Sequence, residues 1–164
     1  MLRGLVSQMN DMYAARADEA PTDELAELTG IRTGPSTSPD DPILSRLLPD
    51  FHRLDDDRPT KEDIDSAAML RSLHEPGLLD LKTGVADLLL DTCPPAGGDV
   101  RLTVEQADAW LSAINDVRLA LGTALDVSED MPDELPDDDP RSPHLAVYHW
   151  LTWVQESLVQ ALTE

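Results

Sequence analysis

Histidine is the side chain best suited to exchange protons or to bind a metal near neutral pH, and this sequence has four. They are His52, His74, His144 and His149. None falls in the His-Glu-x-x-His or paired-cysteine spacing that brings two ligands to one zinc ion. His144 and His149 are five residues apart, which puts them on different faces of a helix. The histidines therefore predict no metal centre, and we expect ordinary surface or partly buried positions for them.

Two runs of three aspartates, at residues 55–57 and 137–139, are the candidates for binding a cation. Consecutive carboxylates point in several directions, and the alternating ligands and central glycine of a calcium loop are missing. Solvated loop charge is the favoured interpretation. Weak, non-selective binding of divalent ions is the alternative.

Cys93 is the only cysteine, so no disulfide can form within the chain. A catalytic thiol needs a neighbouring general base, and the surroundings of Cys93, a predicted helix end followed by two prolines, supply none. Gly97 and Gly98 form a turn without the context of a phosphate-binding loop. The sequence thus predicts no catalytic, cofactor-binding or metal-binding residue, and we expect the protein not to be an enzyme.

Four residues are instead candidates for contacting a partner: Asn115, Arg118, Trp150 and Trp153. Asn115 and Arg118 are one turn apart on the polar side of a predicted helix, near its apolar border. They suit either a recognition spot or a polar clamp between two helices of the same chain. The two tryptophans lie on the last predicted helix, and tryptophan is enriched at interface hot spots. A two-fold homodimer through them is one interpretation, and burial by the protein's own chain is the other.

Length and charge limit the classes of function. A chain of 164 residues predicts one domain, 1–164, with flexible loops at 31–42 and 126–142. The 33 acidic and 12 basic residues give a net charge of −21, which repels nucleic acid and anionic membranes at long range. No apolar run approaches the ~20 residues of a membrane span, and no signal-peptide pattern is present. We therefore expect a cytoplasmic protein without a membrane partner and without direct nucleic-acid binding.

Helical spacing of apolar residues predicts the elements that position these side chains. The best-formed helix is Leu102–Leu125, where Thr103 and Gln106 make a capping box and Val104, Trp110 and Leu111 belong to the apolar stripe. Further helices are predicted at 1–17, 22–29, 42–48, 60–75, 78–90 and 142–162, with Pro76-Gly77 separating two of them. The fold class is therefore all-α, a single-domain bundle of six or seven helices, with a short extended segment possible only at 100–102.

The last predicted helix is apolar over much of its circumference. Val147, Leu151, Val154, Leu158 and Leu162 form one stripe, and Trp150 and Trp153 form a second line on its flank. A helix of this composition is usually buried within a bundle or an interface. We expect it to be enclosed on more than one side.

Two segments of the chain resemble a known actinobacterial family. They are AWLSAINDVRLALGTALDVSED at 109–130 and AVYHWLTWVQESLVQAL at 146–162, supported by the shorter pieces LRGL at 2–5 and LLPD at 47–50. The family is number two thousand and seventeen of the domains of unknown function, and its members are typically encoded near the ClpS adaptor. The likeness spans most of the chain and is most specific in the C-terminal third.

The resemblance implies an all-α body and no known enzyme activity. Some members are described as transcriptional regulators that answer oxidative stress through a protein partner. An intrachain thiol switch cannot be carried over, because Cys93 stands alone. The leading hypothesis is a non-enzymatic regulatory or adaptor protein that acts through protein contacts. A regulator that binds DNA directly and an uncharacterised enzyme are the alternatives. A DNA reader needs a basic face, whereas here the basic residues Arg46, Arg53, Arg58 and Lys61 alternate with acidic ones.

Overall fold

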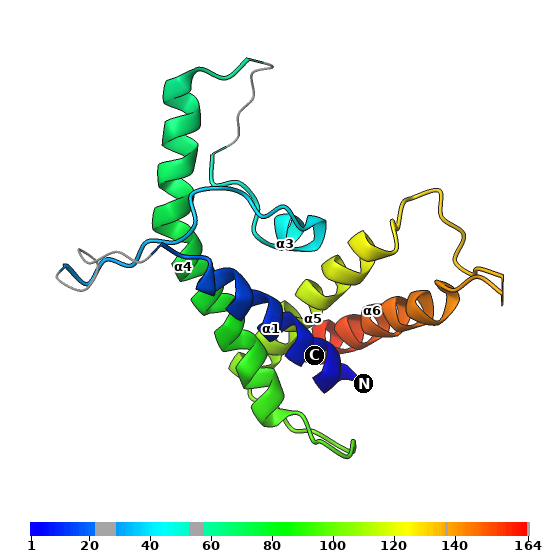
Figure 1. Cartoon of the computed structure of the whole chain (residues 1–164). Helices are drawn as coiled ribbons and strands as arrows, with labels where there is room; N and C mark the ends of the chain where they lie inside the picture. Colours follow the sequence, from blue (N-terminus) through cyan, green and yellow to red (C-terminus); the bar gives the residue numbers. More distant parts are fainter. Residues whose placement is uncertain (22–28, 53–57, 137, 164) are drawn as a thin grey trace. The chain divides into compact units, whose positions relative to one another are not determined.

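The structure is a computed structural model, and it describes residues 1–21, 29–52, 58–136 and 138–163. These residues contain five helices and no strand (Figure 1). The helices are α1 (Leu2–Asp18), α3 (Pro42–Leu47), α4 (Lys61–Thr92), α5 (Val104–Ala124) and α6 (Ser142–Thr163). The predicted all-α class is confirmed, and the described residues contain five helices rather than the predicted six or seven. The helix expected at 22–29, apart from its last residue, and the aspartate run at 55–57 lie outside the described residues.

Contacts along the chain gather in two compact units, one formed by residues 1–9 and 85–164 and the other by residues 10–84. The first unit has an apolar core. Its buried side chains include Val6, Leu89, Trp110, Ile114, Val117, Leu145 and Leu151. The second unit buries fewer apolar side chains, namely Tyr13, Leu47, Leu48 and Leu79, together with the charged Arg16, Arg71 and Glu75. Charged groups are thus a large share of what the second unit encloses.

Helix α4 is one helix of 32 residues, so the predicted break at Pro76-Gly77 is wrong. Proline has no N–H, and it leaves the carbonyl of the residue four positions earlier without its helical partner. Here that carbonyl belongs to Ser72, and it accepts a 2.7 Å hydrogen bond from the backbone N–H of Gly34. Ser72 Oγ in turn donates to the Gly34 carbonyl at 3.0 Å. A distant loop therefore supplies the donor that the proline lacks, and the helix continues.

Gly34 lies so close to this helix that it has no room for a side chain. A Cβ there would stand 3.0 Å from both Cδ and Cγ of Pro76, two atoms of a rigid ring. We expect Gly34→Ala to lower the free energy of unfolding by about 1–3 kcal/mol, the usual cost of overpacking. The measurement is urea unfolding followed by circular dichroism. Gly77→Ala is the control, because its Cβ would meet nothing within 4 Å and it should instead stabilise the helix by ~0.5–1 kcal/mol. Equal stability of the two variants would contradict the close approach.

The buried face of α4 is partly charged. Leu73 and Ile64 are exposed, and Leu81 is 70% exposed, although all three are apolar. The face that is buried carries Arg71, Glu75 and Leu79 instead. A prediction from hydrophobic periodicity assigns every charged residue to the exposed face. It contains no information on an opposite charge, far away in the sequence, that makes the burial of a charged residue tolerable.

Helix α5 begins and ends as local sequence rules require. Both hydrogen bonds of the predicted Thr103–Gln106 capping box are present. At the other end Asp126 takes the left-handed conformation, with φ of 54°, and Val127 N–H donates to the Gly122 carbonyl, as in a Schellman motif. Val104 is exposed rather than part of the core, because it stands in the first turn. Residues 100–102 form no strand.

The C-terminus of α4 is held by two side chains of its own unit. Arg3 donates from Nη1 to the carbonyl of Cys93 at 2.7 Å and also to that of Leu90, and a cation at a helix C-terminus satisfies both the free carbonyls and the helix dipole. Trp110 Nε1 donates to Thr92 Oγ1 at 2.7 Å. These bonds tie α4 to α1 and to α5.

Candidate interaction face on α5 and α6

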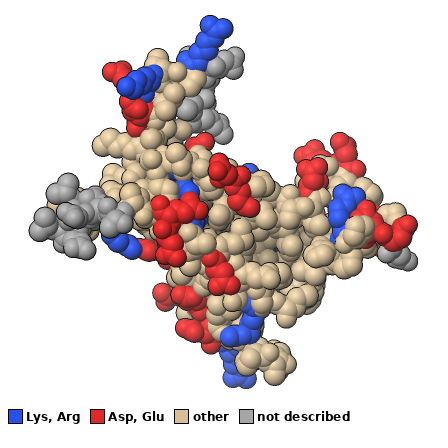
Figure 2. Space-filling model, in the orientation of Figure 1, with Lys and Arg blue, Asp and Glu red and all other residues tan. Residues whose placement is uncertain are grey.

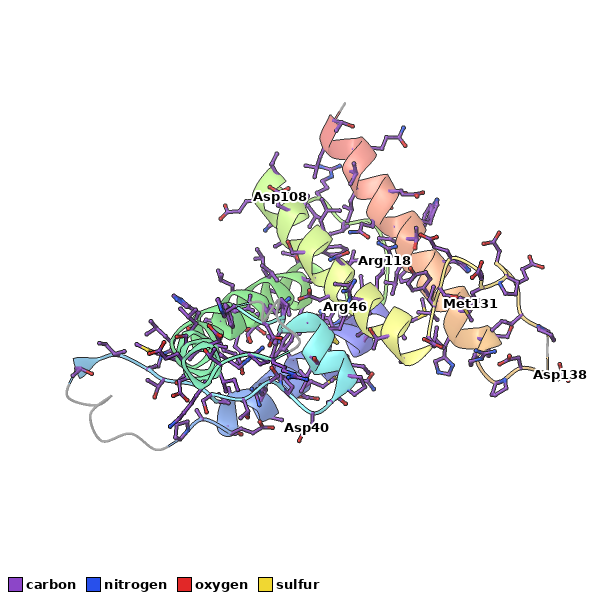
Figure 3. All side chains as sticks on the ribbon, turned by 90° about the horizontal axis from the view of Figure 1, so that it is seen from above. Asp40, Arg46, Asp108, Arg118, Met131 and Asp138 are labelled. Atoms are coloured by element: carbon purple, nitrogen blue, oxygen red, sulfur yellow. The ribbon has the colours of Figure 1, made fainter. Side chains whose placement is uncertain are left out.

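Helices α5 and α6 lie side by side (Figure 1). The loop between them, residues 125–141, is rich in aspartate and glutamate, and we name it the acidic loop. Arg118 projects from α5 toward α6 (Figure 3). Its Nε donates to Thr152 Oγ1 at 3.1 Å, and its Nη1 donates to Gln155 Oε1 at 2.5 Å. The guanidinium also lies 5.4 Å from the centre of the Tyr148 ring, within range of a cation–π interaction. Of the two predicted roles, these contacts correspond to the interhelical clamp, and they leave Arg118 committed within the chain.

The other three candidates for partner contact have different surroundings. Asn115 is half-buried on α5, and Trp150 is half-buried on α6. Trp153 is 63% exposed. Helix α6 is less enclosed than its apolar composition predicts, since Leu145 and Leu151 are its buried residues. Helix α5 contacts α6, and Trp153 remains accessible.

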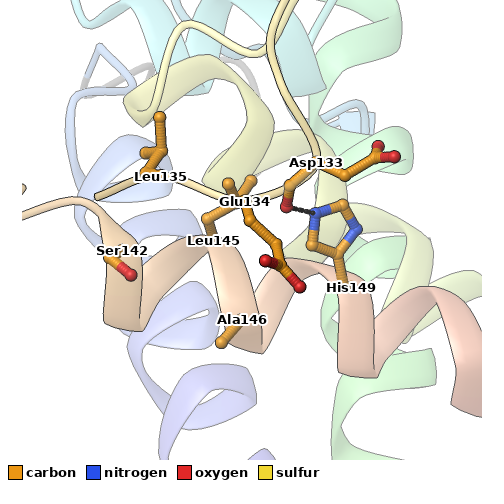
Figure 4. A pocket seen from close by; sticks show the side chains of 7 residues that line it. All are labelled: Asp133, Glu134, Leu135, Ser142, Leu145, Ala146 and His149. Atoms are coloured by element: carbon orange, nitrogen blue, oxygen red, sulfur yellow. Dashed lines mark hydrogen bonds between the residues drawn. The ribbon is translucent and has the colours of Figure 1, made fainter. Parts of the chain in front are cut away.

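A pocket of about 680 Å³ opens between the acidic loop and the first turns of α6 (Figure 4). Its wall is apolar where Leu135, Leu145 and Ala146 line it, and Asp133 and Glu134 stand on its loop side. His149 Nε2 lies 3.2 Å from the Asp133 carbonyl oxygen, which fixes the loop against the helix. A cavity with aliphatic walls and carboxylates suits the side chain of a lysine or arginine, whose stem is apolar and whose head is charged.

The acidic loop forms no metal centre among the described residues. No group of three or more histidine, cysteine, aspartate or glutamate side chains converges in that part of the chain. Asp139 instead binds Arg141 through two side-chain contacts of 3.1 and 2.8 Å. The hydrogen bonds from Arg141 hold the pKa of Asp139 below its usual range. The interpretation of these aspartates as ordinary loop charge remains the favoured one, although Asp137 lies outside the described residues.

Cys93 is a free thiol and half-buried. Its backbone carbonyl, rather than its sulfur, makes the contact with Arg3.

The second unit contains a charged cluster that sequence reasoning missed. We name it the Glu75 cluster, and it consists of Arg16, Asp50, Arg71 and Glu75. Glu75 is fully buried, and its two oxygens accept from Arg16 Nε and Arg71 Nη1, each at 2.6 Å. Arg16 also donates to the carbonyl of Thr37, and Arg71 donates to the carbonyl of Leu48. The cluster therefore pins two loops to α1 and α4. Arg71 and Glu75 at i and i+4 were a visible signal, but their burial was not.

Hydrogen bonds favour the ionised forms of two members of this cluster, Arg16 and Asp50. Burial disfavours the charge on Arg16, but hydrogen bonds from its guanidinium to Glu75 and Glu19 outweigh it, so its pKa lies above the ordinary value. Hydrogen bonds donated by Ser38 and then by Arg71 hold the pKa of Asp50 below its usual value of 3.8. Every acceptor and donor named here is engaged within the chain, which marks the cluster as a structural element.

Asp50 gives this unit a testable dependence on pH. A carboxyl with a lowered pKa stabilises the fold above its unfolded pKa, and this contribution is lost as the pH falls through the folded pKa. We expect wild type to be more stable than Asp50→Asn by a constant amount above about pH 5, and the difference to shrink below about pH 4, the range of an unfolded aspartate. The effect should be small, because the Asp50 side chain is 66% exposed. Unfolding curves of both proteins at several pH values measure it, and a difference that grows on acidification would contradict the assignment.

The domain of unknown function DUF2017 matches residues 1–162 of the chain. The chain belongs to this family. Among DUF2017 relatives, the oxidative stress regulator AosR of Mycobacterium tuberculosis (strain H37Rv) is 47% identical over 167 residues, which cover 99% of this chain and 77% of the relative. The putative oxidative stress regulator AosR of Mycobacterium leprae is 43% identical over 171 residues, with the same coverage. No solved structure matches the chain. The predicted family resemblance is confirmed.

Within the described part of this DUF2017 chain, no helix has the length and apolar character needed to cross a bilayer.

Proposed function

We propose that this chain is a non-enzymatic cytoplasmic regulator that acts in stress-linked control by binding another protein. The names of the mycobacterial relatives support the regulatory role. The observation that favours binding to protein, rather than to DNA, is that many of the basic side chains already make contacts within the chain. The chain has 12 lysines and arginines. Those whose hydrogen bonds or ion pairs within the described residues are known include Arg3, Arg16, Arg32, Arg71, Arg118 and Arg141.

A DNA-binding face is built from clustered basic groups that neutralise phosphates. Arg16 and Arg71 are buried, and Arg32 and Arg141 each face a carboxylate. These four arginines are therefore already paired with carboxylates, in a chain whose net charge is −21. The alternative of direct DNA binding would need a cluster of the remaining basic residues.

Charge also indicates the chemistry of the partner. A strongly acidic protein attracts a basic surface at long range and speeds its association. The pocket of Figure 4 suits a lysine or arginine of such a partner, because its aliphatic wall is combined with Asp133 and Glu134. We propose a basic segment of a regulatory protein as the occupant.

DNA binding by the purified chain is expected to be weak. At physiological salt its Kd should be no tighter than the ~10⁻⁴ M end of non-specific binding. The measurement is fluorescence anisotropy with labelled duplexes of random and genomic sequence, repeated at several salt concentrations. Sub-micromolar binding that depends on sequence would overturn the protein-contact proposal in favour of direct DNA recognition.

Quantitative affinity purification from the native cell tests the proposal itself. The tagged chain should enrich one protein in near-stoichiometric amount, with and without peroxide treatment as the two arms. Glu134→Lys, in the pocket, should release that protein. Asp108→Lys is the matched control, because it makes the same change of charge at an exposed position on α5. Retention of the partner by both variants would exclude the pocket, and the absence of any enriched protein would contradict the function.

A further inference from the structure

One side of α6 is apolar or small and carries no charge. We name it the tryptophan face, and it consists of Ala146, Trp150, Trp153, Val154, Ser157 and Ala161. Ala146, Trp153, Ser157 and Ala161 are exposed, and Trp150 and Val154 are half-buried. The face follows the 4-3-4-4 spacing of one helix side. It runs along a helix of 22 residues, which is about 33 Å long at ~1.5 Å per residue.

The other sides of α6 already make contacts within the chain. Leu151 is buried, and Tyr148, Thr152 and Gln155 hold Arg118 of α5. Glu156 is the one lysine, arginine, aspartate or glutamate in residues 142–163, and it lies about 100° from the centre of the tryptophan face at ~3.6 residues per turn. The tryptophan face is thus distinct from the side of α6 that holds Arg118, and Trp153 is its most exposed large side chain.

The tryptophan face carries no charged side chain, although the chain as a whole is strongly acidic. Two copies of a chain with a charge of −21 repel each other wherever carboxylates meet carboxylates. In Figure 2 red side chains lie on several elements, the loop before α6 among them, whereas the visible surface over the body of α6 is mostly tan. A second copy that approaches over Trp150 and Trp153 therefore meets no carboxylate of this face. A basic partner would find no carboxylate among the residues of the face itself.

The order of side chains on the face also fits a copy of itself. If two α6 helices run antiparallel about a two-fold axis between residues 153 and 154, Ala146 meets Ala161, Trp150 meets Ser157 and Trp153 meets Val154 of the other copy. A large side chain then opposes a small one on each side of the axis, and alanine opposes alanine at the ends. Such interdigitation is what close helix packing requires, and self-complementarity is the condition for a two-fold interface.

We propose that the tryptophan face binds the same face of a second copy of this chain, with the two α6 helices antiparallel. Trp150 is already half-buried and Trp153 is 63% exposed, so each has less left to bury than the ~150–250 Å² of a whole tryptophan. The four tryptophans of a dimer therefore supply only part of the ~1,200 Å² at the lower limit of stable interfaces. The dimer is accordingly weak, and its outer end shares Ala146 with the pocket proposed for the regulatory partner.

Sedimentation equilibrium tests the association. Raising the salt from about 0.01 M to about 1 M shortens the Debye length from roughly 30 Å to roughly 3 Å, so the dimer fraction should increase. Trp153→Glu should weaken dimerisation by at least about 30-fold, as expected for a hot spot worth ~2 kcal/mol. Leu81→Glu is the matched control, because it adds the same charge at a 70% exposed apolar residue and should leave dimerisation nearly unchanged. A monomer at every salt and protein concentration, or equal effects of the two variants, would overturn the proposal.

Cross-linking tests the antiparallel arrangement without changing either tryptophan. In a Cys93→Ser background, which has no other thiol, Ala146→Cys and Ala161→Cys should form a disulfide-linked dimer when the two proteins are mixed under mild oxidation. Neither should link to itself, because like positions would be about 22 Å apart along the axis at ~1.5 Å per residue, far beyond the ~4.4–6.8 Å between the Cα atoms of a disulfide. Self-linking as efficient as cross-linking, or no linking at all, would refute this geometry. Both tests use purified protein alone, so failure here leaves the proposed regulatory function standing.

Discussion

Replacing Glu75 by alanine is expected to lower the free energy of unfolding by about 3–5 kcal/mol, the usual result of removing one partner from a buried ion pair. Glu75 is fully buried and accepts hydrogen bonds from Arg16 and Arg71 at 2.6 Å each. Without it the two guanidiniums, both about 96–97% buried, would face each other with no anion between them. The loss of the carboxylate should therefore cost more than its own contacts.

Thermal and urea unfolding followed by circular dichroism measure this effect. Asp80→Ala is the control, because Asp80 also pairs with an arginine, Arg32, but both side chains are more than half exposed. Exposed ion pairs contribute little, so this variant should unfold almost as wild type does. A stability of Glu75→Ala close to that of Asp80→Ala would mean that the Glu75 cluster does not hold the second unit together.

Replacing Trp110 by alanine is expected to cost about 3–5 kcal/mol, as for other buried large-to-small changes. Trp110 is 6% exposed in the apolar core of the first unit, and its indole N–H donates to Thr92 Oγ1 at 2.7 Å. The substitution leaves a cavity in this core and removes a link between α5 and the end of α4.

Trp153→Ala is the matched control for this change. It removes the same side chain from a position that is 63% exposed, where substitutions usually alter stability by no more than ~0.5 kcal/mol. Both variants are compared by unfolding at a protein concentration low enough for the monomer to dominate. If Trp153→Ala were as destabilising as Trp110→Ala, the tryptophan face would be part of the core, and the proposed dimer would lose its surface.

The sequence by itself determined the elements whose causes are local. The capping box of Thr103 and Gln106 sets the start of α5, and Asp41 with Pro42 sets the start of α3. Both depend on side chains within one turn of the atoms they satisfy. The all-α class likewise follows from the helical spacing of apolar residues. The family follows from a few distinctive residues.

Only the tertiary structure decided the features that depend on a partner far along the chain. Helix α4 continues through Pro76 because Gly34 supplies the missing donor, and Arg71 and Glu75 are buried because Arg16, some 60 residues earlier, completes their charge balance. The accessibility of Trp153 depends on which sides of α6 its neighbours reach. In the sequence the tryptophan line and the leucine stripe are equally apolar, since hydrophobicity records how strongly a side chain favours burial and not which surface will cover it.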